Sequence, residues 1–335
     1  MKKIRISKML VVMLCVIVVF CASNITGLAK KFKVGFSMVM MDCPYFVEMK
    51  KVAEEEAKRL NIDLIILDAR GKIDKQLSDV EDLISQNVDL LIIDPVDTIG
   101  PRVCVKAAND ANIPVFIFND LIVLTPDIKV VTTFVEDAFA TSKLAGMYAA
   151  KLMGTNKYNI VLINGLPGAQ SEWRRKHGAL QGIIEYQLEK YNSTYVNVLS
   201  QGWGNWAYDL ALSAMEDILS AFPDTPIDVI IAGNDTMALG ALKAMEEAGR
   251  LDELKFLAAC ADGQKEALQA MVEVQFQGKY VCSGRNWPGY MMKEGLNIAM
   301  QILNGKTDWP EFTYPEPELI TKENVKQYYD SESGF

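Results

Sequence analysis

Short apolar runs alternate with amphipathic segments along the chain from residue 33 onward. The runs are apolar enough to be strands buried on both faces. The segments between them carry apolar residues at spacings of three and four, the pattern of helices with one buried face. This alternation predicts an α/β fold in which helices cover parallel sheets.

The expected strands lie at residues 33–38, 63–68, 89–93, 114–118, 129–134, 158–163, 194–200, 227–232, 255–261 and 279–284. The expected helices lie at 45–60, 74–86, 100–111, 138–153, 172–190, 206–221, 236–248, 264–273 and 288–303. One small sheet cannot hold so many strands, so we expect two doubly wound, Rossmann-like sheets of about six strands each. Because no Pro/Gly/Ser-rich linker separates them, short ordered crossings should join the two lobes.

The first 29 residues have a different pattern. Four basic residues precede an apolar run at 9–20, and small residues lead to Gly27 and Ala29. This predicts a secretory signal peptide cleaved after Ala29, and hence an exported, periplasmic or extracytoplasmic protein. A single-span anchor is the alternative, although the run is shorter than the roughly twenty residues that cross a bilayer. A lipid-modified N-terminus at Cys21 is a third option, although the bulky Phe20 precedes it.

Cleavage would remove four basic residues and no acidic one, so the formal net charge would fall from −9 to −13. So acidic a protein is not expected to bind nucleic acid. Cys43, Cys104, Cys260 and Cys282 would remain, without the close CxxC pairs of a zinc site, and no metal or cofactor is expected. Cys260 and Cys282 fall in predicted core strands, where we interpret them as buried thiols; a disulfide between them stays open.

The sequence offers little that would support catalysis. His177 is the single histidine, and no Ser or Cys nucleophile lies in a recognisable elbow. The glycine-rich loop at 164–171 lacks both the Gly-Lys-Ser/Thr ending of a phosphate-binding loop and the GxGxxG spacing. We therefore expect neither an enzyme nor a nucleotide-binding protein.

Polar and aromatic residues directly follow several predicted strands, at 41–46, 119–120, 203–206, 233–235, 261–263 and 285–287. The carboxyl ends of parallel strands meet at one edge of a sheet, where open sheets bind ligands. Amides and carboxylates pair with hydroxyl groups, and aromatic rings cover the C–H face of a sugar. Each residue alone is more readily explained by turn or cap chemistry. The set as a whole predicts a site for a polyhydroxylated ligand.

The turn after strand 227–232 illustrates the two roles. In Gly233-Asn234-Asp235, Asp235 is predicted to cap the following helix. Asn234 is then left to reach the ligand.

At these residues the chain resembles the type I periplasmic sugar-binding proteins of ABC transporters, in their ribose-binding-protein-like branch. Asp42-Cys43-Pro44-Tyr45-Phe46 is similar to the family's Asn/Asp-x-Pro-aromatic-aromatic turn, and the segments at 234–240 and 262–263 are similar as well. The resemblance covers nearly all of the mature chain. It implies two α/β lobes joined by three hinge crossings, an N-terminal lobe of 31–134 plus 287–313 and a C-terminal lobe of 135–286 plus 314–335.

The resemblance also implies a set of ligand contacts, with aromatic residues that stack on the sugar and polar residues that hydrogen-bond to it. These are Asp42, Tyr45, Phe46, Asn119, Asp120, Trp173, Arg174, Trp206, Asn234, Asp262 and Asn286. The chain departs from the family where Asn119-Asp120 replaces an Asp-Arg pair, where Cys43 replaces an amide, and where Trp173 takes the place of an arginine. The implied ligand is therefore a sugar or polyol, without a commitment to ribose.

The implied function is capture of a monosaccharide or related polyol by hinge closure and its delivery to an ABC transporter permease, with the protein acting as a monomer. The alternative is a ligand-sensing receptor subunit whose closed form docks on a chemoreceptor or sensor kinase. An exported carbohydrate-active enzyme is a third hypothesis. A repressor's effector domain shares this fold, but the signal peptide and the lack of DNA-binding helices argue against it.

Overall fold

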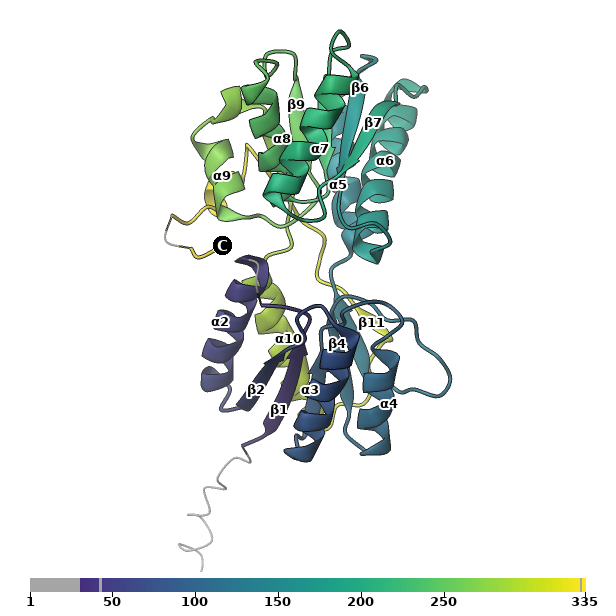
Figure 1. The fold of residues 1–335 in the computed structure, drawn as a ribbon, viewed down its shortest axis with the longest axis vertical. Helices are drawn as coiled ribbons and strands as arrows, with labels where there is room; N and C mark the ends of the chain where they lie inside the picture. The colour runs from purple at the N-terminus through teal and green to yellow at the C-terminus, as the bar shows by residue number, and fades with distance from the viewer. Residues whose placement is uncertain (1–30, 42–43, 332) are drawn as a thin grey trace, which may run out of the picture. The chain divides into compact units, whose positions relative to one another are not determined.

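The computed structural model describes residues 31–41, 44–331 and 333–335. They fold into two six-stranded sheets, each covered by helices (Figure 1). Residues Lys33–Phe335 form one compact unit. The predicted signal peptide and the predicted ligand residue Asp42 lie outside the described residues. Among the helices that are described, none has the length and apolar character needed to cross a bilayer.

The first sheet has the strand order β11-β5-β4-β3-β1-β2, and every neighbouring pair is parallel. Its strands are β1 (Lys33–Met38), β2 (Asp63–Asp68), β3 (Leu90–Ile93), β4 (Val115–Asn119), β5 (Thr132–Val135) and β11 (Phe312–Thr313). The helices packed on it are α2 (Pro44–Arg59), α3 (Ile73–Ser85), α4 (Arg102–Asp110) and α10 (Pro288–Leu303). α10 comes from late in the chain and packs beside α2 (Figure 1).

Alternate residues of the first sheet point to two separate cores. Phe36, Ile92 and Phe116 pack in one core with α2 and α10. Their sequence neighbours Ile93 and Ile117 pack in the other core with α3 and α4. Since both faces are buried, the strands are apolar throughout, which explains the continuous apolar runs in the sequence.

The second sheet has the strand order β12-β10-β9-β8-β6-β7, and only the β10–β12 pair is antiparallel within it. Its strands are β6 (Asn159–Asn164), β7 (Asn197–Trp203), β8 (Val229–Ala232), β9 (Phe256–Ala259), β10 (Tyr280–Gly284) and β12 (Leu319–Thr321). Its helices are α5 (Ala138–Met153), α6 (Gln170–Tyr191), α7 (Tyr208–Ala221), α8 (Asp235–Glu247) and α9 (Lys265–Val272). Two short 3₁₀ helices, η1 (Phe276–Gly278) and η2 (Val325–Gln327), complete this part.

The second sheet also has a core on each face. Ile230 and Leu257 belong to the core shared with α7, α8 and α9, whereas Ile231 belongs to the core shared with α5 and α6. Cys260 and Cys282 lie in the latter core as free, buried thiols, so the disulfide left open by the sequence is not formed.

The chain passes between the two sheets three times, after β5, after β10 and after β11. The predicted α/β class with two doubly wound sheets of six strands is confirmed. Two strands were not predicted, β11 and β12. They have two and three residues, too few for a periodic pattern to show in the sequence.

Candidate functional site

Polar side chains from the strand ends of both sheets form one connected group, which we call the polar cluster. Its members interact through hydrogen bonds or short-range charge effects, and they are Tyr45, Asp94, Asn119, Asp120, Glu136, Arg175, Asn234, Asp262 and Asn286. Each lies at the end of a strand or in the first turns of a helix. The sheet edge predicted to bind ligand therefore does gather polar groups.

The Tyr45 hydroxyl joins the ends of strands from the two sheets. It donates to Asn119 Oδ1 at 3.0 Å and lies 3.3 Å from Asn286 Oδ1. Burial raises the pKa of Tyr45 well above its ordinary value, and the negative charges of Asp262 and Glu136 raise it further. The hydroxyl therefore stays protonated and acts as a hydrogen-bond donor.

Arg175 is the buried cation of the cluster, with only 7% of its surface exposed. Its Nη2 donates to Glu136 Oε2 at 2.7 Å, its Nη1 donates to the Gly233 carbonyl at 3.2 Å, and its guanidinium lies 5.3 Å from the centre of the Trp206 ring. Burial lowers the pKa of Arg175, but the carboxylates of Glu136 and Asp262 outweigh burial and raise it. Arg175 is thus a fixed positive charge that also stacks on an aromatic face.

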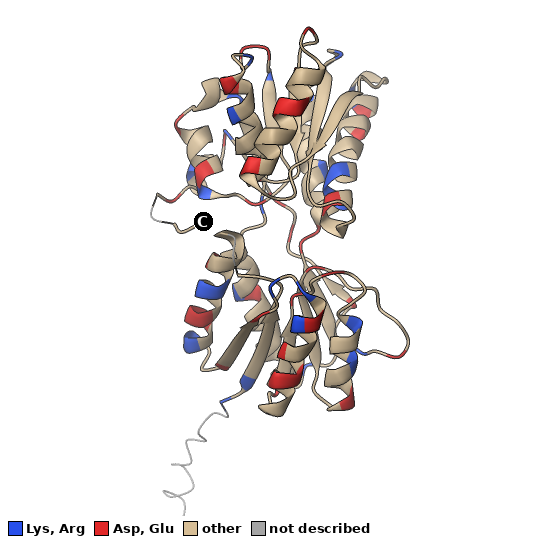
Figure 2. Ribbon diagram, viewed as in Figure 1, with Lys and Arg blue, Asp and Glu red and all other residues tan. Residues whose placement is uncertain are grey.

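Helix packing fixes the position of Arg175. α6 lies so close to α5 that a Cβ on Gly178 would be 2.4 Å from the Phe139 carbonyl oxygen. Arg175, Gly178 and Ala179 share one face of α6 because they are three and four residues apart. Figure 2 shows blue segments at the start of α6, where the basic run at 174–176 lies.

The residue that caps α8 is Asn234, whereas the sequence predicted Asp235. Asn234 is the N-cap of α8, because its Oδ1 accepts from the Met237 N–H at 3.0 Å. Its Nδ2 donates to Asp262 Oδ2 at 3.1 Å, so the same side chain also belongs to the polar cluster. The prediction that Asp235 caps the helix is wrong, because the helix begins at Asp235 itself.

Asp235 is instead a fully buried acceptor behind the polar cluster. It accepts hydrogen bonds from the Tyr280 hydroxyl, the Ser283 hydroxyl and the Gln264 N–H, each at 2.6 Å. These bonds connect the start of α8 to β10 and to the start of α9. Asp235 therefore has a structural role, as expected, but a different one from capping.

We expect Asn234→Ala to destabilise the protein by about 2–3 kcal/mol, since it removes a helix cap and a buried donor to Asp262. Asn234→Ser retains a cap acceptor and loses only the donor, so it should recover about 1 kcal/mol. Urea unfolding of both variants measures the difference. Equal losses in the two variants would contradict the capping role.

Burial perturbs the carboxyl groups of the cluster. It raises the pKa of Asp94 well above its ordinary value, and it raises the pKa values of Asp120 and Asp262. Among the described residues, Asp94 Oδ2 and Glu136 Oε1 are buried acceptors without a hydrogen-bond partner, and Arg175 Nε is a buried donor without one. Buried polar atoms normally have partners, so these atoms suit a ligand that both donates and accepts.

Three predicted site residues have a backbone conformation that L-residues rarely adopt, Asn119 with φ 69°, Trp206 with φ 67° and Asp262 with φ 112°. Such strain collects at functional sites. The Trp206 ring also lies directly on the glycine-rich loop, where a Cβ on Gly165 would be 2.0 Å from the ring. Close packing against Trp206 thus explains why residue 165 is a glycine, and a role of the loop in phosphate binding is not needed to explain it.

Most of the predicted site residues lie in or beside the polar cluster. Phe46 contacts Tyr45 edge-on, with the ring centres 5.3 Å apart, and packs on the core that the first sheet shares with α2 and α10. Trp173 does not join the cluster, because it is 55% exposed and stacks on His177. Arg174 is half-buried as a whole, but its Nη1 is a buried donor without a hydrogen-bond partner among the described residues, and its positive charge acts to lower the pKa of Asp120, so it lies beside the cluster.

The sequence analysis missed Asp94, Glu136 and Arg175. Asp94 and Glu136 directly follow β3 and β5, so the rule that selected the other strand-end residues applies to them too. Within the described residues, no group of three His, Cys, Asp or Glu side chains is arranged to hold a metal ion.

Comparison with known proteins assigns the family. A family model described as a periplasmic binding protein domain matches residues 34–307. The chain is 31% identical over 281 residues to the ribose import binding protein of Bacillus subtilis (strain 168), an alignment that covers 84% of this chain and 85% of that protein. The chain belongs to the type I periplasmic sugar-binding proteins. Proteins of this family bind substrates rather than convert them and act outside the cytoplasm.

Two further relatives support this assignment. A xylitol-binding protein of Mycolicibacterium smegmatis is 33% identical over 286 residues, which cover 84% of this chain and 75% of that protein. The structure of an ABC transporter solute binding protein from Bacillus halodurans C-125 with bound myo-inositol has a TM-score of 0.77 and 30% identity, covering 90% of this chain and 99% of that one. The predicted family and the type I fold are confirmed.

Proposed function

We propose that this protein binds a monosaccharide or polyol at the polar cluster and delivers it to the permease of an ABC transporter. The observation that carries the proposal is a buried set of donors and acceptors beside the rings of Tyr45 and Trp206. The bound compounds named for its relatives, ribose, xylitol and myo-inositol, are all polyhydroxylated. We further propose that the protein acts as a monomer, without catalysis, after cleavage behind Ala29.

Hydrogen bonds and stacking provide enough free energy for this function. A net hydrogen bond contributes about 0.5–1.5 kcal/mol, so eight to ten of them with two aromatic faces reach the roughly −8 kcal/mol of micromolar binding after entropic costs. Because both lobes contribute groups to the polar cluster, the ligand should stabilise an arrangement in which both contact it. We place the lobe limits at 31–134 plus 287–313 and at 135–286 plus 314–335, which agrees with β11 and β12 belonging to different sheets.

A thermal-shift screen of the mature protein tests the proposal. At about 100 times its Kd, a neutral ligand such as D-ribose, xylitol or myo-inositol should stabilise the protein by about 2.7 kcal/mol and raise Tm by roughly 5–10 °C. D-gluconate, the matched anion, should cause a smaller shift than the neutral compounds, because Glu136 already neutralises the buried Arg175 and the carboxylate of D-gluconate would have to lose its hydration in the site.

Two outcomes of the thermal-shift screen would contradict the proposal. If no neutral sugar or polyol raises Tm, the proposed ligand class is wrong. If D-gluconate raises Tm more than the neutral compounds do, the polar cluster does not select ligands by its charge.

A further inference from the structure

Phe335 is buried even though it follows the last strand and helix among the described residues. Only 5% of its surface is exposed. Its ring meets the Tyr45 ring edge-on, with the centres 5.7 Å apart and the planes at 79°. Tyr45 thus has two edge-on aromatic neighbours, Phe46 and Phe335. This is the same Tyr45 whose hydroxyl joins Asn119 and Asn286.

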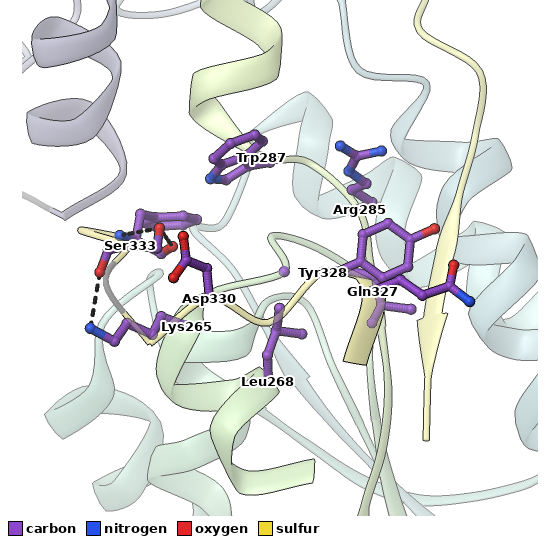
Figure 3. A pocket seen from close by; sticks show the side chains of 11 residues that line it. Lys265, Leu268, Arg285, Trp287, Gln327, Tyr328, Asp330 and Ser333 are labelled. Atoms are coloured by element: carbon purple, nitrogen blue, oxygen red, sulfur yellow. Dashed lines mark hydrogen bonds between the residues drawn. The ribbon is translucent and has the colours of Figure 1, made fainter. Parts of the chain in front are cut away.

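Hydrogen bonds hold the segment 333–335 in place. Lys265 Nζ, at the start of α9, donates to the Ser333 carbonyl at 2.9 Å (Figure 3). The Ser333 hydroxyl donates to the Phe335 carbonyl at 2.6 Å and lies 3.3 Å from the Phe335 N–H, so the segment turns back on itself. The bond from Lys265 attaches the segment to α9, a helix of the second sheet.

The same segment lies against α2 of the first lobe. A Cβ built on Gly334 would be 2.8 Å from Glu48 Oε2, so the backbone at Gly334 passes directly beside that helix. The segment 333–335 therefore contacts α9 and α2, which belong to different lobes.

A cavity of about 230 Å³ lies beside this segment. Phe335 and Ser333 line it together with Gly263, Arg285 and Trp287 (Figure 3). Gly263 directly follows Asp262 of the polar cluster, and Trp287 directly follows Asn286. The segment thus forms a wall of a cavity next to the proposed binding site.

We propose that the segment 333–335 is a latch that positions Tyr45 for the ligand and slows the ligand's departure. This inference rests on the proposed function. The direction of the Tyr45 hydroxyl depends on the orientation of its ring, and an edge-on aromatic pair restrains that orientation. Phe335 is therefore a positioning residue, which acts on the ligand through Tyr45.

Hydrogen–deuterium exchange tests the latch without any ligand. In Phe335→Ala, amides at the start of α2, residues 45–51, should exchange about threefold to tenfold faster than in the wild type, the range that corresponds to one aromatic pair. Phe276→Ala is the control, because it deletes a ring that packs on the second lobe's core. If Phe335→Ala leaves exchange at 45–51 unchanged, or if Phe276→Ala accelerates it equally, the latch is refuted.

Stopped-flow fluorescence tests the effect on binding, with D-ribose, xylitol and myo-inositol as probes. For any probe that binds the wild type, Phe335→Ala should dissociate about threefold to tenfold faster. Phe335→Tyr retains the ring and should restore the wild-type rate. A wild-type dissociation rate in Phe335→Ala overturns the latch and leaves the proposed function intact. If no probe binds the wild type, the proposed function fails, and the exchange experiment alone decides whether Phe335 positions Tyr45.

Discussion

Replacing Arg175 with alanine should destabilise the protein by about 3–5 kcal/mol and weaken binding of the ligand about 10- to 100-fold. The guanidinium is the positive partner of Glu136 at 2.7 Å, and the two side chains are 7% and 5% exposed. Removing it leaves a buried carboxylate without its counter-charge, which costs more than the ion pair contributes. It also removes the cation from the Trp206 face and the donor to the Gly233 carbonyl.

Urea unfolding and isothermal titration with the ligand from the thermal-shift screen measure both effects. Arg174→Ala is the matched control, because it deletes the same side chain one residue earlier from a half-buried position. It should change stability by less than about 1 kcal/mol. A larger loss of affinity in Arg174→Ala than in Arg175→Ala would show that the sequence-based choice of arginine was correct.

The choice between the two arginines shows how far sequence reasoning reaches. Resemblance to the family placed a ligand-binding arginine near the start of α6, and the helix was predicted from its periodicity. The small residues Gly178 and Ala179 mark the buried face of that helix. Arg175 lies three and four residues before them, so the helical period favours it over Arg174. The sequence therefore does identify the buried arginine, but only through its helical spacing from Gly178 and Ala179.

Other features depend on contacts that no local pattern encodes. Asn and Asp are about equally good N-caps, so a sequence in which Asn234 precedes Asp235 does not decide which residue begins the helix. The contact between Phe335 and Tyr45 joins opposite ends of the described chain, and no local pattern around either residue predicts it. The alternation of strands and helices, by contrast, depends on burial of both sheet faces and is therefore visible along the whole chain.

Replacing Asp235 with alanine should destabilise the protein by about 3–5 kcal/mol at pH 5, because three buried polar groups would lose their hydrogen-bond partner. These are the Tyr280 hydroxyl, the Ser283 hydroxyl and the Gln264 N–H. Ser283→Ala removes one of the donors and leaves the Gly263 N–H, which donates to Ser283 Oγ at 3.1 Å, without its acceptor, so it should cost about 2 kcal/mol. Asp252→Ala is the matched control, since it makes the same substitution at an exposed position of the same lobe.

The loss caused by Asp235→Ala should also depend on pH. Burial, and then the charge of Asp262, raise the pKa of Asp235 above its ordinary value. As pH rises from the ordinary value toward the raised one, the unfolded chain releases the proton while the folded protein keeps it, so the wild type loses stability with rising pH. The alanine variant lacks this contribution. Its deficit relative to the wild type should therefore be smaller at pH 8 than at pH 5 by at least about 1 kcal/mol, which corresponds to roughly one pKa unit. Urea unfolding at the two pH values measures this difference, and an equal deficit at both would mean that the buried carboxyl titrates as it does in the unfolded chain.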